Sequence, residues 1–148
     1  MTGIDSLSGE HVYLDANVFI YAVEGYAKYS SLCTGLLQSI ERMTLHSVTS
    51  ELTLAEVLVR PLKDAKRAIA KIYEDLIQTQ FDLNVVPVTR NVLIEAAKLR
   101  AAAGCRLPDA IHIATAQLSA SKIFLTADKT LKVPSPLRVV TLDELLAD

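Results

Sequence analysis

The stretch Val12-Tyr13-Leu14-Asp15-Ala16-Asn17 joins a short apolar run to an aspartate and then to the start of a helical pattern. The run His11–Leu14 has the length and residue types of a buried strand, which we expect to end at Asp15. The following residues, Asn17–Val23, are typical of a short helix. This order of strand, aspartate and helix is the first unit of a pattern that continues along the chain.

Short apolar runs alternate with longer helical patterns, which predicts an α/β fold around a mainly parallel sheet. Further strands are expected at Thr44–Val48, Leu83–Val88, Ile123–Thr126 and Leu137–Thr141. Six further helices are expected: Ala27–Met43, a helix capped by Ser50 and ended by Pro61, Asp64–Gln80, a helix from Thr89 to Ala103 stopped by Gly104, a helix that Pro108 begins and that ends near Leu118, and Leu142–Leu146.

The composition bounds the class of protein. A length of 148 residues predicts a single domain, residues 1–148, with one sizeable core. A hydrophobic fraction of 51% and a mean hydropathy of +0.30 exclude intrinsic disorder. Fifteen Lys and Arg against seventeen Asp and Glu give a net charge of −2, so bulk charge does not hold this chain to nucleic acid. A nucleic-acid substrate would have to be engaged by local basic patches or through metal.

The sequence also predicts a compartment. Cys33 and Cys105 lack the spacing of a zinc site or a disulfide framework, so we expect reduced thiols. The first ten residues contain two acids and no signal-peptide pattern. No run approaches the roughly 18 apolar residues of a membrane span. We therefore expect a cytoplasmic protein without membrane association.

Four carboxylates occupy unusual positions. Asp15 and Asp128 each follow a predicted strand, and the carboxyl ends of parallel strands are where ligand crevices form. Asp109 lies in the first turn of its helix, and Glu56 interrupts an apolar stretch in which an unpaired acid would be costly. Several acids at one crevice would suit a hard divalent ion such as Mg²⁺ or Mn²⁺.

Each acid also has a simpler explanation. Asp109 could serve only the helix dipole, and Asp128 could serve only a turn. Glu56 could pair with Arg60 one helical turn later. Asp15 has the weakest alternative, because a strand-end aspartate followed by Ala-Asn is not a usual hairpin signal.

Four ordered segments resemble the motifs of PIN-domain nucleases. The resemblance covers roughly Val12 to Thr141. Within this family, the sequence looks most like the small VapC-type toxins that cut RNA. The segments are Val12-Tyr13-Leu14-Asp15-Ala16-Asn17-Val18-Phe19-Ile20-Tyr21, Ser50-Glu51-Leu52-Thr53-Leu54-Ala55-Glu56-Val57-Leu58, Leu107-Pro108-Asp109-Ala110-Ile111-His112-Ile113-Ala114-Thr115-Ala116 and Phe124-Leu125-Thr126-Ala127-Asp128.

The resemblance implies a three-layer PIN-like fold and a metal-dependent endoribonuclease. It implies that a short antitoxin protein holds the nuclease inactive. It also implies an acidic pocket binding one or two Mg²⁺ or Mn²⁺ ions, with Thr126 orienting a ligand or water and Asn17 supporting Asp15. The implied metal ligands are Asp15, Glu56, Asp109 and Asp128. Bound metal would activate a water and neutralise the scissile phosphate, which carboxylates alone would repel.

Other residues have two interpretations. His112 could be a ligand or a packed neighbour of the site, and the tyrosines at 21, 26 and 29 could stack bases or pack in an interface. The early helices around Tyr26–Leu37 could form a homodimer contact. A basic set could be a solvated face or could bind RNA phosphates; it comprises Arg60, Lys63, Lys66, Arg67 and Lys71, with Arg106 elsewhere in the chain.

Two other functions fit the same residues. A PIN fold could serve as a non-catalytic binding or regulatory module, although the complete acidic set argues against a decayed site. The acids could also serve a related metal-dependent DNA nuclease or phosphohydrolase. Activity on RNA and single-stranded DNA with Mn²⁺ and with EDTA separates these functions.

Overall fold

We describe the fold from a computed structural model covering residues 3–147. Five strands form one sheet in the order β3-β2-β1-β4-β5, and every pairing between neighbours is parallel. The parallel α/β fold predicted from the sequence is therefore confirmed. The strands are β1 (His11–Leu14), β2 (His46–Ser50), β3 (Leu83–Val86), β4 (Ile123–Thr126) and β5 (Arg138–Thr141).

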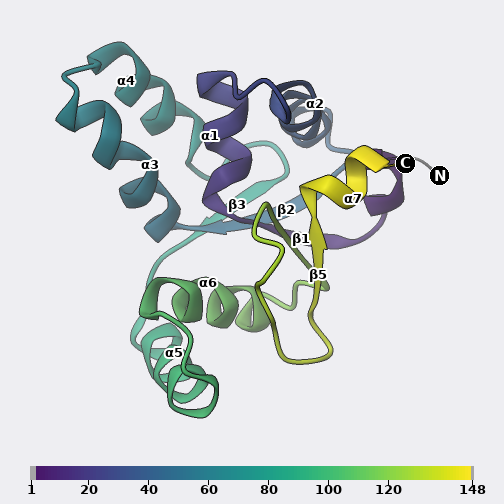
Figure 1. The fold of residues 1–148 in the computed structure, drawn as a ribbon, viewed down its shortest axis with the longest axis vertical. Helices are drawn as coiled ribbons and strands as arrows, with labels where there is room; N and C mark the ends of the chain where they lie inside the picture. The colour runs from purple at the N-terminus through teal and green to yellow at the C-terminus, as the bar shows by residue number, and fades with distance from the viewer. Residues whose placement is uncertain (1–2, 148) are drawn as a thin grey trace.

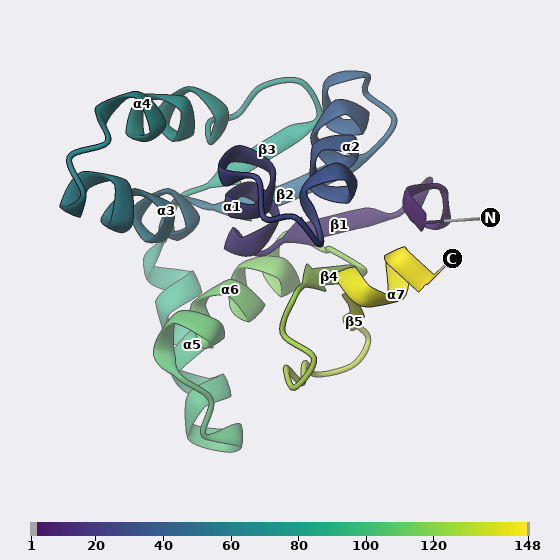
Figure 2. The ribbon, with the colours of Figure 1, turned by 45° about the horizontal axis from the view of Figure 1, so that its top comes forward.

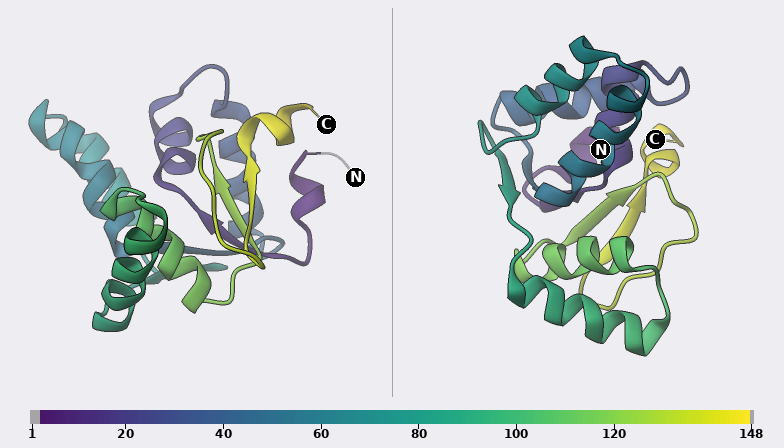
Figure 3. Two further views of the ribbon diagram at one scale, coloured as in Figure 1. Left: turned by 60° about the horizontal axis from the view of Figure 1, so that its bottom comes forward. Right: turned by 90° about the vertical axis from the view of Figure 1, so that its left-hand side faces the viewer.

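Helices cover both faces of this sheet and make three layers (Figures 1 and 2). The pair α5 and α6 lies against one face, and the other helices lie on the opposite side (Figure 3, right). Of the helices between residues 3 and 147, none is long and apolar enough to span a membrane. The helical elements are η1 (Gly3–Leu7), α1 (Ala16–Glu24), α2 (Ser30–Glu41), α3 (Glu51–Lys63), α4 (Arg67–Leu76), α5 (Arg90–Ala103), α6 (Leu107–Leu118) and α7 (Leu142–Ala147).

The central strand β1 supplies side chains to both cores. Val12 and Leu14 are fully buried in the apolar cluster beneath α1, α2 and α4. Tyr13 points to the other face, where its ring stacks on Phe124 with centroids 5.0 Å apart, in the cluster that contains Ile113 of α6. Because successive side chains of a strand alternate in direction and both faces are covered, the strand is apolar throughout.

Three predicted helix ends are confirmed. The Ser50 side chain caps α3 by accepting from Leu52 N, and the Thr89 side chain caps α5 by accepting from Val92 N. Gly104 ends α5 with a left-handed φ of 69°, a conformation that favours glycine.

Several predicted boundaries are wrong. Helix α2 is shorter than the predicted range Ala27–Met43, and β3 ends at Val86 and not at Val88. Pro61 does not end α3, which continues to Lys63 with the proline buried inside the helix. The helix predicted at 64–80 covers only Arg67–Leu76, since the chain turns at Ala65 with a positive φ of 55°. Strand β2 begins two residues later than predicted, at His46.

Candidate active site

Hydrogen bonds of Thr126 connect the end of β1 with the end of β4. Asp15 caps α1 by accepting a hydrogen bond from Ala16 N at 2.8 Å through Oδ1. Its other oxygen, Oδ2, accepts from the Thr126 hydroxyl at 2.7 Å. The Thr126 oxygen in turn accepts from Asp128 N at 3.0 Å. The predicted residues Asp15, Thr126 and Asp128 therefore form one connected unit.

This unit lies at the topological switch point of the sheet. From β1 the chain runs to β2 and β3 on one side, and it returns to form β4 on the other side of β1. Ligand crevices in parallel α/β sheets form outside the carboxyl ends of the strands at such a point. Asp15 and Asp128 follow the two strands, β1 and β4, that flank it.

Asp109 and Asp128 line one crevice together with Arg106 and Thr130. Hydrogen bonds from the Thr130 hydroxyl and backbone N–H to Oδ1 lower the pKa of Asp128 from its ordinary value, and the charge of Arg106 adds to this effect. Arg106 Nε lies 3.6 Å from Asp109 Oδ2. These contacts favour the ionised form of Asp128, which is the form that binds a cation.

Glu56 contacts a histidine on another helix. His112 Nε2 lies 2.6 Å from Glu56 Oε1, whereas Arg60 Nε lies 3.9 Å from Asp64 Oδ2. The alternative in which Glu56 pairs with Arg60 one helical turn later is therefore not observed, because α3 turns Glu56 toward His112 of α6. His112 is itself buried at 2% exposure, and its Nδ1 lies 2.5 Å from the Tyr13 hydroxyl.

The pKa of Tyr13 is affected by two of the acids. Burial raises the pKa of Tyr13 well above its ordinary value, and the negative charges of Asp15 and Glu56 raise it further. The same phenol is therefore near the carboxylate at the end of β1 and the one on α3. No sequence pattern indicated that Tyr13 would contact His112, because the two residues are 99 positions apart.

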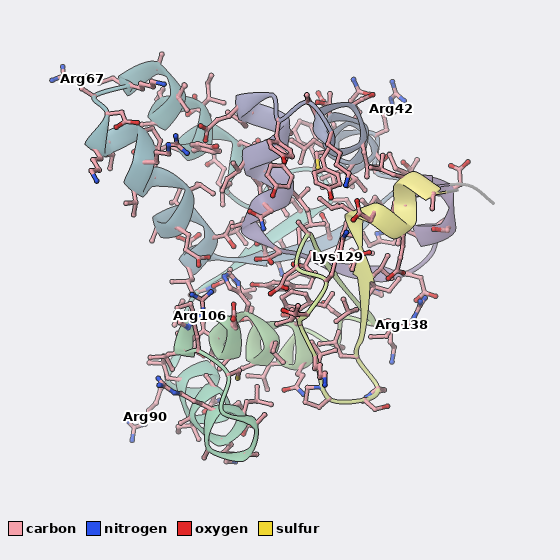
Figure 4. The ribbon with its side chains drawn as sticks, in the orientation of Figure 1. Arg42, Arg67, Arg90, Arg106, Lys129 and Arg138 are labelled. Carbon is pink, nitrogen blue, oxygen red and sulfur yellow. The ribbon has the colours of Figure 1, made fainter. Side chains whose placement is uncertain are left out.

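The remaining predicted residues lie in three places. Asn17 lies in the first turn of α1 and is half-buried. Lys63, Lys66 and Arg67 are exposed where α3 turns into α4, a hairpin that extends away from the sheet (Figure 3, left). Figure 4 shows Arg67 at the tip of this hairpin, away from Arg106 beside α6. The structure thus brings Arg106, but not the other predicted basic residues, to the acidic crevice.

A group of three tyrosines is joined to α7. Tyr21, Tyr26 and Tyr29 stack on one another with ring centroids 4.7–5.8 Å apart. The Tyr29 hydroxyl donates to Asp143 Oδ1 at 2.6 Å, and Lys129 Nζ lies 2.6 Å from Asp143 Oδ2. The contact between Asp143 and Lys129 could not be predicted from the sequence, because an acid in the first turn of a helix and a single lysine form no distinctive pattern.

The carboxylate oxygens of the four acids are suitable ligands for a hard divalent cation. The acids lie farther apart, however, than the ligands of a bound metal ion do. Carboxylate oxygens are the ligands that Mg²⁺ and Mn²⁺ prefer. Between residues 3 and 147, however, no three His, Cys, Asp or Glu side chains lie close enough together to hold an ion. Binding of a cation by three or more of these acids requires some of their side chains to move closer.

The chain matches one protein family and is similar in fold to several solved structures. The family described as PIN domain matches residues 12–135. No curated protein matches the chain. A chain of a toxin–antitoxin complex from Klebsiella pneumoniae is similar, with 22% identity, a TM-score of 0.63, and coverage of 88% of this chain and 97% of that one.

Two further solved structures are similar in fold. One is VapBC2 from Rickettsia felis bound to a DNA fragment from its promoter, with 15% identity, a TM-score of 0.68, and coverage of 88% of this chain and 98% of that one. The other is the sarcin–ricin loop cleaving toxin VapC20 from Mycobacterium tuberculosis, with 13% identity, a TM-score of 0.64, and coverage of 76% and 86%. At these identities the likeness is one of fold.

Proposed function

Because this chain belongs to the PIN domain family, we propose that it is a metal-dependent endoribonuclease and the toxin of a toxin–antitoxin pair. The observation that carries the proposal is the junction of Asp15, Thr126 and Asp128 at the switch point of the sheet. A hydroxyl there holds the ends of β1 and β4 in fixed relation, and Asp109 lines the same crevice as Asp128. An acidic crevice of this kind suits phosphodiester hydrolysis assisted by a divalent cation.

The residues that would hold Mg²⁺ or Mn²⁺ are Asp15, Glu56, Asp109 and Asp128. The bound ion would supply an activated water and offset the charge of the scissile phosphate. The hydrogen bond from Thr126 would hold the orientation of Asp15, and those from Thr130 favour the ionised form of Asp128. Arg106, whose side chain is 84% exposed, would contact a phosphate of the RNA at the rim.

The proposed partners follow from the same interpretation. One similar structure is named as a toxin that cleaves the sarcin–ricin loop, which supports RNA as the substrate class. Others are toxin–antitoxin assemblies, which supports a short antitoxin that covers the crevice in the cytoplasm and inserts an Arg or Lys where the cation charge would be. A homodimer contact on the early helices, Tyr26–Leu37, remains part of the proposal, and light scattering that gives a monomer at high concentration would remove it.

The test uses the purified full chain with total RNA and with single-stranded DNA, each with Mn²⁺ and with EDTA. Cleavage of RNA that requires Mn²⁺ and is absent in the Asp109→Asn variant is the expected result. Cleavage of DNA alone would favour the related DNA nuclease, and no cleavage of either with Mn²⁺ would favour the non-catalytic module. Mapping the cleavage sites on cellular RNA then identifies the target.

A further inference from the structure

His112 is a buried polar residue for which the chemistry proposed above has no use. It lies on α6 three residues after Asp109, so both side chains project from neighbouring positions on the helix. Only 2% of the residue is exposed, and each ring nitrogen has a partner on a different element. Nε2 meets Glu56 of α3 at 2.6 Å, and Nδ1 meets the Tyr13 hydroxyl of β1 at 2.5 Å.

The two contacts fix which nitrogen carries the proton. An ionised carboxylate only accepts hydrogen bonds, so the bond to Glu56 requires a proton on Nε2. A neutral imidazole carries one N–H, and Nδ1 is then the acceptor for the O–H of Tyr13. In the neutral imidazole, donation therefore runs from Tyr13 to His112 and from His112 to Glu56.

In this hydrogen-bonded series, Tyr13 is held rigidly, whereas the side chain of Glu56 can rotate. Tyr13 is fully buried in the central strand and stacks on Phe124. Glu56, in contrast, has a side chain 35% exposed and several rotatable bonds. A half-exposed glutamate gains a fixed orientation only from a partner that is itself fixed, and His112 provides that partner. Its bond occupies Oε1, and no hydrogen bond found among residues 3–147 reaches Oε2.

We propose that His112 is a positioning residue. Tyr13 holds its imidazole in place, and the imidazole in turn holds Glu56 so that one carboxylate oxygen points toward the acidic crevice. This inference rests on the proposed function for the role of Glu56, while the tautomer and the contacts do not. His112 touches neither RNA nor cation in this role. Partners that orient a ligand in this way are typically worth about 10–100-fold in metal affinity or activity.

The first test is spectroscopic and needs no activity. Long-range ¹H–¹⁵N spectra of the metal-free, ¹⁵N-labelled full chain report the tautomer of each histidine, and His112→Gln assigns the signal. We expect the proton of His112 on Nε2. A proton on Nδ1 alone would overturn the proposal, because Nε2 would then have nothing to donate to Glu56.

The second test uses a matched pair of variants. The amide nitrogen of Gln reaches the place of Nε2 and can still donate to Glu56, whereas Asn reaches only the place of Nδ1, toward Tyr13. We expect His112→Asn to weaken Mn²⁺ binding, measured by calorimetry, by about 10–100-fold and to lower kcat for RNA with little change in KM. His112→Gln should recover most of that loss. Thermal unfolding checks that both variants are folded.

A double-mutant cycle separates positioning from a general effect on the core. In a Glu56→Gln background, His112→Asn should weaken Mn²⁺ binding no further, because the residue acts through Glu56. An undiminished loss in that background, or no loss in the wild-type background, would overturn the positioning role. A wild type that neither binds Mn²⁺ nor cuts RNA would instead overturn the proposed function, and the tautomer would still decide whether His112 donates to Glu56.

Discussion

The Thr126 hydroxyl and the Asp15 carboxylate, 111 positions apart in sequence, meet at 2.7 Å across the switch point of the sheet. Thr126 is fully buried, and its oxygen also accepts the backbone N–H of Asp128. One hydroxyl thus fixes the orientation of one acid and the backbone of another. Its removal should therefore change both stability and activity.

Thr126→Val tests this link, because valine has nearly the same shape and no hydroxyl. The Asp128 N–H and one Asp15 oxygen would lose their partner, which should lower the free energy of unfolding by about 1–3 kcal/mol. RNA cleavage should fall by roughly 10–100-fold. Chemical denaturation and cleavage rates measure the two effects. Thr126→Ser keeps the hydroxyl and is the control, so a Val variant as stable and active as the Ser variant would contradict the link.

Asp15→Asn and Asp109→Asn test the acids as donors to a cation. The amide keeps nearly the same volume, and asparagine is as good a helix cap as aspartate, so the Asp15→Asn variant should keep α1 capped. RNA cleavage should fall by more than the roughly 10–100-fold that loss of an outer contact costs. Circular dichroism and Mn²⁺-dependent cleavage are the measurements. Metal-dependent activity retained in the double variant would exclude the proposed mechanism.

The strands and the helix caps were predictable because they depend on neighbouring residues. The run Ile123–Thr126 was assigned correctly from its apolar residues alone. Thr89 and Gly104 bound α5 as expected, since a cap and a left-handed stop are local features. Helix α4 was overestimated, because its pattern continues to Gln80 while the chain leaves the helix after Leu76.

From the sequence, a shared edge for two of the acids could be predicted, whereas the side-chain contacts around them could not. The placement of Asp15 and Asp128 after strands indicated a common edge, since parallel strands end together. The contact of Glu56 with His112 depends on how α3 and α6 pack across the sheet, and the 56 positions between them carry no signal of it. The local alternative, Arg60 at one turn, was the wrong partner for this reason.

The stability of the fold should depend on pH through Asp143. Hydrogen bonds from Lys129, Tyr29 and Lys28, in this order of effect, hold the pKa of Asp143 well below its usual range. A pKa lowered in the folded state stabilises the fold above the unfolded value of about 3.9, and that stability is lost as the pH falls below it. Because solvent screens these contacts, the effect should be modest.

Asp143→Asn is the variant that isolates this contribution. Its Tm should lie below that of the wild type at about pH 7, and the gap should narrow steadily between about pH 4 and about pH 2. Glu41→Gln, which removes the same charge from an exposed position at the end of α2, is the control and should show no such trend. A gap that is constant across this range would show that Asp143 acts through shape and not through charge.

The basic residues of the α3–α4 hairpin offer the last prediction. Lys63, Lys66 and Arg67 are exposed, and no ion pair found among residues 3–147 includes them. Arg60 and Lys71, on the same hairpin, lie 3.9 Å from Asp64 and 2.9 Å from Asp75. The first three therefore have charge available for RNA, while the other two are partly neutralised.

Replacing Lys63, Lys66 and Arg67 together with Ala should raise KM for RNA, with a much smaller change in kcat, because none of them can ligate a cation. Each lost phosphate contact on a single strand should reduce the salt slope by about 0.7. The matched control replaces Arg60 and Lys71 with Ala and should shift KM and the slope less. If the hairpin is only a solvated face, the triple variant will match the wild type across a salt titration, and RNA binding will have to be assigned to Arg106 and the crevice alone.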